Sequence, residues 1–195
     1  DEVITPALTW ATTVFPIAQV GAVPVLVDVD RETYNIRPEA IEAAITPRTR
    51  AIMPVHLLGN PCDMDAIMEI ARQHKLYVIE DACEAFGSSL NGTKAGRFGW
   101  MGTFSFFCTH TVATGEGGAI ITDDYDLAAL CRSLRSHGRA GEKAALKFTI
   151  DHIGFNGKMN GLEAALGCAV MQNIDEVVAK RRANFWTLYK LLQDS

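Results

Sequence analysis

The sequence lacks several features that would place it in large classes of proteins. It has no apolar run long enough to cross a bilayer and no signal sequence at its start, so we expect a cytoplasmic protein without a membrane partner. It also has no basic stripe, because its 18 lysines and arginines are interspersed with 23 aspartates and glutamates, for a net charge of −5. Nucleic acid is therefore not expected as a partner.

Paired cysteines are absent as well. The five cysteines stand singly, without a C-x-x-C pair, at Cys62, Cys83, Cys108, Cys131 and Cys168. This spacing predicts reduced thiols and indicates neither a disulfide framework nor a zinc site. Asp28 and Asp30 form a D-x-D pattern after an apolar run, which we interpret as the polar end of a strand in preference to a metal site.

What the sequence does have is a regular alternation of apolar strands and helical segments. With 195 residues, 48% of them hydrophobic, the chain can bury one sizeable core, so residues 1–195 are predicted to form one domain or the larger part of one. The alternation predicts right-handed βαβ units and hence an α/β fold, with a mainly parallel sheet between two helical layers.

The expected elements follow from these patterns. Strands are predicted at residues 2–5, 23–30, 51–57, 76–81, from 103 onward, and at 118–122. Helices are predicted at residues 11–20, 37–45, 64–74, 124–136, 161–173 and 175–192, with Asp63 as the N-cap of the third. Residues 138–150 are predicted to be a mobile loop.

Distinctive side chains follow three of the strands, at the edge where open parallel sheets bind ligands. Trp10 follows the first strand, and Asp81 ends a nearly continuous apolar run, where an isolated carboxylate is costly unless it is paired. A polar turn that carries His110 follows the strand beginning at residue 103. Plainer interpretations stay open: a core tryptophan, an aspartate that caps a helix, and a solvated turn histidine.

Three stretches together resemble one family: PALTW at residues 6–10, VIEDACEAFGS at 78–88 and TFSFFCTHTVATGEGG at 103–118. The chain resembles, essentially from end to end, the DegT/DnrJ/EryC1/StrS sugar aminotransferase-like family of fold-type I pyridoxal-phosphate (PLP) enzymes. The resemblance implies a three-layer α/β/α large domain that binds PLP or pyridoxamine phosphate (PMP). It also implies that an amino-terminal segment with a phosphate-binding turn, and a small carboxy-terminal domain, are missing from residues 1–195.

One position departs from most of that family. Five residues after Ser105, where most members carry the lysine that forms a Schiff base with the cofactor, this sequence has His110. A histidine cannot form a stable imine with an aldehyde, whereas its ordinary pKa of about 6.5 suits proton transfer near neutrality. The exchange is similar to that in the PMP-dependent nucleotide-sugar 3-dehydratases. It implies removal of the 3-hydroxyl of an NDP-4-keto-6-deoxyhexose in deoxysugar or lipopolysaccharide biosynthesis, with His110 as the catalytic residue.

The resemblance also assigns contacts with the cofactor ring. Asp81 would pair with the protonated pyridine nitrogen, which keeps the ring able to accept electrons. Trp10 would stack on one face of the ring. Cys83 would lie near the opposite face, and Glu84 near the ring hydroxyl. A solvated glutamate remains the alternative for Glu84.

Two further residues would contact the cofactor phosphate. Ser105 matches the serine whose hydroxyl binds this phosphate, beside exposed backbone amides. Asn156, in GFNGK, matches an asparagine that reaches the phosphate bound in the partner subunit, which implies a homodimer with shared active sites. The alternative for Asn156 is a left-handed turn residue.

The cysteine pattern separates two branches of the dehydratases. One branch is known for an iron–sulfur cluster that uses a cysteine at the position of Cys83 and three more in a later loop. That loop here reads SHGRAGEKAALKF, residues 136–148, without cysteine, so the four-cysteine cluster cannot be built and no metal is expected. The better match is the branch that regenerates PMP from glutamate as amino donor.

Other departures leave two alternatives to the dehydratase. Trp100, Thr111 and the Asn160-Gly161 pair differ from residues that are usual in the family or subgroup, which weakens the substrate assignment more than the cofactor assignment. One alternative is a PLP-dependent nucleotide-sugar aminotransferase whose lysine has been replaced, naturally or by engineering. The other is a non-catalytic cofactor-binding module.

Overall fold

A six-stranded sheet forms the centre of the molecule, in the order β2-β1-β3-β4-β7-β8. The computed structural model describes residues 1–140 and 149–193. The strands of this sheet are β1 (Glu2–Pro6), β2 (Val23–Val27), β3 (Thr49–Ile52), β4 (Tyr77–Asp81), β7 (Met101–Ser105) and β8 (Gly118–Ile121). Neighbouring strands are parallel except β7 and β8, which are antiparallel. The mainly parallel α/β fold is thus confirmed.

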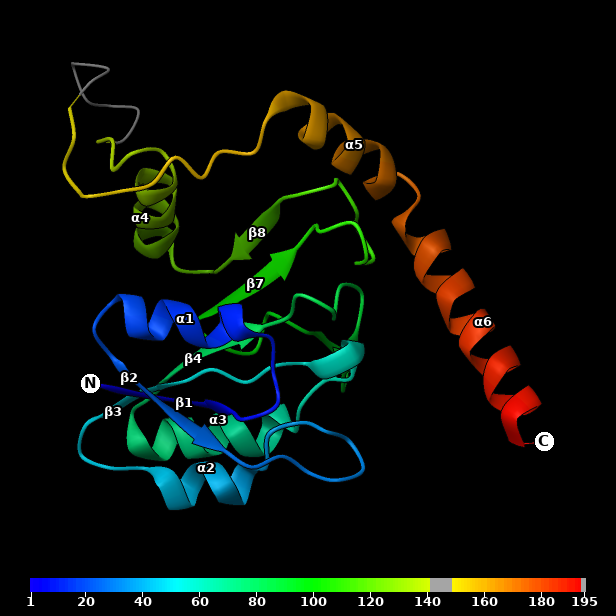
Figure 1. Cartoon of the computed structure of the whole chain (residues 1–195), viewed down its shortest axis with the longest axis horizontal. Coiled ribbons are helices and arrows are strands. Elements are labelled where there is room, and N and C mark those ends of the chain that lie inside the picture. The colour runs from blue at the N-terminus through cyan, green and yellow to red at the C-terminus, as the bar shows by residue number, and fades with distance from the viewer. Residues whose placement is uncertain (141–148, 194–195) are drawn as a thin grey trace.

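Helices cover both faces of the sheet. The α-helices of the described residues are α1 (Ala11–Gln19), α2 (Pro38–Ala44), α3 (Met64–His74), α4 (Tyr125–Arg135), α5 (Gly161–Met171) and α6 (Ile174–Gln193). In Figure 1, α1 lies on one side of the sheet and α2 and α3 lie together on the other, while α5 and α6 lead away from it. The Asp63 carboxylate accepts a hydrogen bond from the amide of Ala66, which confirms Asp63 as the N-cap of α3.

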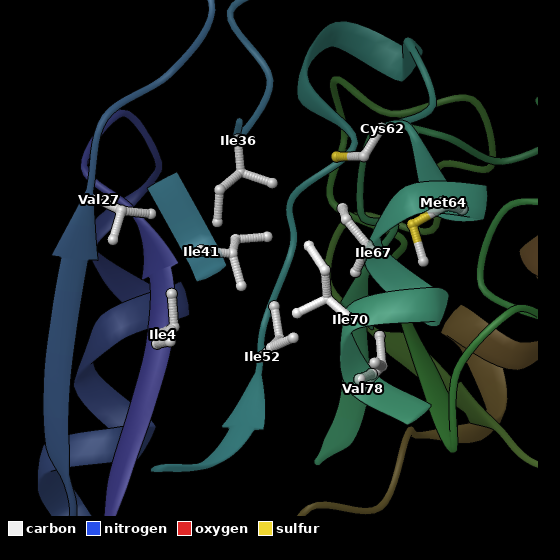
Figure 2. Packing of buried hydrophobic residues seen from close by; sticks show 11 residues of the cluster. Ile4, Val27, Ile36, Ile41, Ile52, Cys62, Met64, Ile67, Ile70 and Val78 are labelled. Atoms are coloured by element: carbon white, nitrogen blue, oxygen red, sulfur yellow. The ribbon is translucent and has the colours of Figure 1, made fainter. Parts of the chain in front are cut away.

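The main core lies between the sheet and the layer formed by α2 and α3. Isoleucines dominate it, and Figure 2 shows side chains from both layers pointing toward one another. The buried members are Ile4, Val27, Ile36, Ile41, Ile52, Cys62, Met64, Ile67, Ile70, Ala71 and Val78. This packing holds β1, β3 and β4 in register, so that their carboxyl ends meet at one edge of the sheet.

Two predicted strands are longer than the observed ones. The strand predicted at residues 51–57 is β3, which ends at Ile52, because Pro54 has no amide hydrogen to continue the ladder. Residues 57–59 form a 3-10 turn instead. The strand predicted at 23–30 ends at Val27, and Asp30 then caps a turn by accepting hydrogen bonds from the amides of Glu32 and Thr33.

The patterns missed one hairpin. Strands β5 (Ser89–Leu90) and β6 (Thr93–Lys94) pair in antiparallel fashion around Asn91-Gly92, both of which have positive φ. Asn-Gly between short strands is typical of a tight hairpin. Of the predicted loop at 138–150, residues 141–148 lie outside the described residues. No helix within the described parts of the chain is long and apolar enough to span a membrane.

Candidate active site

A cavity of about 580 Å³ lies at the edge where the carboxyl ends of β1, β4 and β7 meet. Its walls come from the segments that follow these strands and from the chain after β3. The lining residues are Leu8, Thr9, Trp10, Thr12, Thr13, Val55, Leu57, Asp81, Cys83, Glu84, Ser105, Phe107, Thr109, His110 and Glu116. Six of the seven residues singled out from the sequence therefore line one cavity; Asn156 does not.

Trp10 stands at the junction between β1 and α1. It is the N-cap residue of α1 in extended conformation, and 78% of its surface is exposed, so it is not a core tryptophan. None of the described aromatic rings packs against its indole. A large apolar ring thus lines the cavity with its own surface uncovered, as in a site that stacks on a flat ligand.

Asp81 is the last residue of β4, and its carboxylate accepts hydrogen bonds on both oxygens, with the Cys83 thiol as a further neighbour. The Thr13 hydroxyl donates to Oδ2 at 2.8 Å, and the backbone amide of Cys83 donates to Oδ1 at 3.2 Å. No helix begins at Asp81, so it does not cap one. A carboxylate has room for about four hydrogen bonds, and Asp81 therefore retains acceptor capacity beside the cavity.

Cys83 and Glu84 line the cavity beside Asp81. Burial, followed by the neighbouring Asp81 carboxylate, raises the pKa of the Cys83 thiol to about 12, so this thiol is neutral near pH 7 and poorly nucleophilic. Glu84 is exposed, and its Oε2 accepts a hydrogen bond from the amide of Leu58 at 2.6 Å. Leu58 has a φ of 54°, a left-handed conformation that the Glu84 carboxylate helps to hold.

His110 lies on a loop that is closed at its base. The amide of Phe106 donates to Gly117, and the amide of Thr114 donates back to Phe106. Thr114 is buried, and its hydroxyl donates to the carbonyl of Glu116 at 2.6 Å. Gly117 has a φ of +142°, which explains a glycine in the GEGG exit. The base therefore fixes the frame of the loop.

Within this frame His110 is held mainly through its backbone. Its amide donates to the carbonyl of Phe107 at 3.0 Å, and the two rings contact edge to face with centroids 6.2 Å apart. Among the described residues, none hydrogen-bonds the imidazole. Ser105 uses its hydroxyl to accept a hydrogen bond from the amide of Phe107 at 3.2 Å. The two ring nitrogens are thus left without a hydrogen-bond partner among the described residues, on a residue that lines the cavity.

Asn156 lies away from the cavity. It is exposed and pairs with Ser136 in an isolated antiparallel bridge, and Lys158 donates to its side-chain oxygen at 2.8 Å. Its φ is not positive, so the alternative of a left-handed turn residue is wrong. Its predicted contact with a partner subunit stays a prediction.

The sequence patterns missed the other face of β4. Glu80 and His56 are fully buried, and Nε2 of His56 lies 3.0 Å from Oε2 of Glu80. Oε2 also accepts a hydrogen bond from the amide of Gly96, and Oε1 accepts hydrogen bonds from Phe98 and Gly99. A charged residue inside an apolar strand signals such a network, because a buried carboxylate must be paired.

Three residues that line the cavity, Thr9, Thr13 and Glu116, were also missed by the sequence analysis, and no local pattern marks them.

Comparison with known proteins places this site in a family. GDP-perosamine synthase of Caulobacter vibrioides is 47% identical over 192 residues, which cover 98% of this chain and 51% of that protein. GDP-4-keto-6-deoxy-D-mannose 3-dehydratase of Yersinia pseudotuberculosis is 39% identical over 211 residues, which cover 100% of this chain and 53% of that protein. The chain thus spans about half the length of the curated relatives it matches.

Solved structures show the same fold. The E. coli GDP-4-keto-6-deoxy-D-mannose-3-dehydratase with bound hydrated PLP superposes with a TM-score of 0.92 at 34% identity, and the match covers 100% of this chain and 54% of that one. The model of the DegT/DnrJ/EryC1/StrS aminotransferase family matches residues 1–195. The chain, with its cavity at the carboxyl ends of a mainly parallel sheet, therefore belongs to the DegT/DnrJ/EryC1/StrS aminotransferase family.

Proposed function

We propose that the protein is a PMP-dependent dehydratase that removes the 3-hydroxyl of a nucleotide-linked 4-keto-6-deoxyhexose. One observation carries this proposal: His110 lines the same cavity as Trp10 and Asp81, and no lysine among the described residues lines it. The cavity thus has a group that can move protons where most of the family has an amine that binds the cofactor. Residues 1–195 would form the large, cofactor-binding domain of this enzyme.

The residues around the cavity fit a phosphorylated pyridine. Asp81 retains acceptor capacity for a protonated ring nitrogen, and the uncovered indole of Trp10 offers a flat apolar face. Ser105 supplies a hydroxyl at the end of β7, beside the backbone amides of the loop that follows. A volume of about 580 Å³ is in the usual range for small-molecule sites.

PMP, when bound, supplies an amine that condenses with the 4-keto carbon and a ring that accepts electrons. Asp81 would pair with the protonated ring nitrogen, and Trp10 would stack on the ring and restrict its tilt. His110 would take a proton at the carbon that bears the amine and deliver one to the oxygen of the departing 3-hydroxyl, which would leave as water. The thiol of Cys83, whose pKa is raised, would lie near the ring without attacking the sugar carbonyl, and Glu84 would provide a further hydrogen-bond acceptor at the cavity wall.

Shared sites in a homodimer are part of the proposal. Asn156 is exposed and lies outside the cavity of its own chain, so it is available to a phosphate bound by a partner subunit. Glutamate would regenerate PMP after each turnover, because residues 136–148 contain none of the cysteines that an iron–sulfur cluster needs.

A nucleotide-sugar aminotransferase is the second candidate. The relative named GDP-perosamine synthase is more similar to this chain, at 47% identity, than the relative named 3-dehydratase, at 39%. In this case another group would perform the proton transfer, and His110 would be a replacement that slows turnover.

The variant His110→Lys separates the two candidates. The full-length gene product would be incubated with PMP, glutamate and GDP-4-keto-6-deoxymannose, and the sugar products identified by mass spectrometry. We expect the unaltered protein to release a deoxygenated sugar and the variant to lose this activity by at least about a hundredfold, the usual contribution of a positioned acid–base group. The variant should instead transfer an amino group to the sugar.

Hydride reduction of the PLP-loaded protein gives an independent readout. We expect no cofactor adduct on a lysine of the unaltered protein and an adduct at residue 110 of the variant. His74→Lys, at the exposed end of α3, is the matched control and should form no adduct. Transamination without deoxygenation by the unaltered protein would favour the aminotransferase, and PMP binding without turnover would favour a non-catalytic module.

A further inference from the structure

Two threonines connect the turn that carries Trp10 to the carboxylate of Asp81. The hydroxyl oxygens of Thr9 and Thr13 lie 2.7 Å apart, and the Thr13 hydroxyl donates to Oδ2 of Asp81 at 2.8 Å. Thr13 is only 4% exposed, so water has little access to compete for this bond. The three side chains form a continuous chain of hydrogen bonds along the cavity wall.

The direction of this chain follows from counting protons. A threonine hydroxyl has one proton to donate, and an ionised carboxylate can only accept. Because Thr13 gives its proton to Asp81, it must accept the proton of Thr9. Thr9 therefore orients Thr13, and Thr13 orients the carboxylate, while the amide of Cys83 holds the other oxygen.

Thr9 and Thr13 connect two parts of the cavity lining, the turn at Trp10 and the end of β4 at Asp81. Thr9 directly precedes Trp10, and Thr13 lies in the first turn of α1, where its amide donates to the carbonyl of Trp10 at 3.0 Å. The Thr13 side chain crosses from this turn to the end of β4. The same residue thus ties the backbone under the indole to the carboxylate.

We propose that Thr13, oriented by Thr9, is a positioning residue that fixes the Asp81 carboxylate relative to Trp10 and so sets how tightly and in which orientation the cavity holds a flat, protonated heteroaromatic ring. The inference rests on the proposed function in taking that ring to be the pyridine of PMP. Thr13 acts through Asp81 and needs no contact with the ligand.

The variant Thr13→Val tests the proposal, because it keeps the shape of the side chain and removes the hydroxyl. In the full-length gene product we expect PMP to bind about tenfold more weakly, as for the loss of one hydrogen bond to a charged group. The induced circular dichroism of the bound cofactor, which reports its orientation, should decrease. Thr13→Ser keeps the donor and should stay within about twofold of the unaltered protein. Thr9→Val removes only the outer hydrogen bond and should weaken binding by about threefold.

Thr5→Val is the matched control for stability. Thr5 is fully buried, and its hydroxyl donates to the carbonyl of Met53 at 3.0 Å, away from the cavity. This variant should lower the unfolding temperature and leave PMP binding and the dichroism unchanged. Unaltered binding and dichroism in Thr13→Val, or in Thr9→Val if Thr13→Val does not fold, overturns the inference alone. If the unaltered protein binds no PMP, the inference and the proposed function fail together.

Discussion

The last two residues of β4, Glu80 and Asp81, are both carboxylates, but their side chains lie in different surroundings on opposite faces of the strand. Glu80 faces the interior, is fully buried and accepts four hydrogen bonds, two on each oxygen. Asp81 lines the cavity and accepts hydrogen bonds from the Thr13 hydroxyl and the amide of Cys83, with the Cys83 thiol beside it. Successive side chains of a strand point to opposite faces, so this contrast arises from one step along the chain.

The difference teaches how to separate a structural acid from a ligand-binding one. The acceptor capacity of Glu80 is used up by His56 and by the amides of Gly96, Phe98 and Gly99, which fixes the approach to β7. Asp81 keeps capacity for a partner that the chain does not supply. Counting donors on each carboxylate oxygen thus distinguishes the two residues where residue type and position along the strand do not.

The largest expected effect is on stability, from Glu80→Gln. The amide group would face donors on all sides, because Nδ1 of His56 already accepts from the amide of Cys62 and its Nε2 must therefore donate to residue 80. We expect the free energy of unfolding to fall by about 3 kcal/mol, as for a broken buried network. Urea unfolding followed by circular dichroism measures this, and an unchanged midpoint would show that Glu80 is not structural.

The same exchange one residue later should affect binding and spare the fold. In Asp81→Asn the Thr13 hydroxyl can still donate to the remaining oxygen, and only the amide of Cys83, beside the open cavity, loses its acceptor. We expect the free energy of unfolding to change by less than about 1 kcal/mol, and the affinity for PMP to fall about a hundredfold through loss of a charged hydrogen bond. Calorimetry with PMP checks this, with Glu80→Gln as the matched variant. Loss of stability without loss of affinity would reverse the two assignments.

The smallest expected effect concerns two thiols, Cys62 near Glu80 and Cys83 near Asp81. Burial raises the pKa of Cys62, whose amide donates to His56, and of Cys83, beside Asp81, to about 12 in both cases. Between pH about 9 and about 12 the unfolded thiols ionise and the folded ones do not, so the free energy of unfolding falls as pH rises through this window.

We expect Cys62→Ala to reduce the loss of stability between pH 9 and 10 by about 1 kcal/mol. Cys83→Ala should reduce it less, because water in the cavity screens a charge on that thiol. Urea unfolding at each pH gives the slopes, and comparing slopes within each variant removes the packing cost of the substitution. Equal slopes in Cys62→Ala and the unaltered protein would contradict a buried neutral thiol.

Much of the fold could be predicted because local patterns determine it. The apolar runs marked the sheet strands, and their order fixed a parallel sheet that gathers Trp10, Asp81 and the His110 loop at one edge. Pairings between distant segments could not be predicted in this way. His56 and Glu80 are 24 residues apart, and Thr13 and Asp81 are 68 apart. Such contacts depend on how the helices and strands pack together, and the periodicity of apolar residues along the sequence contains no information on this packing.

The closed base of the loop before β8 bears on how members of this family can diversify. Backbone hydrogen bonds at Phe106 and Thr114 determine the course of the chain, and no described residue hydrogen-bonds the ring of His110, which contacts only the ring of Phe107 edge to face. A mutation at position 110 can therefore replace one reactive side chain by another without changing the hydrogen bonds that hold the loop. A single substitution at this position can therefore alter the reaction without a compensating mutation to restore the fold.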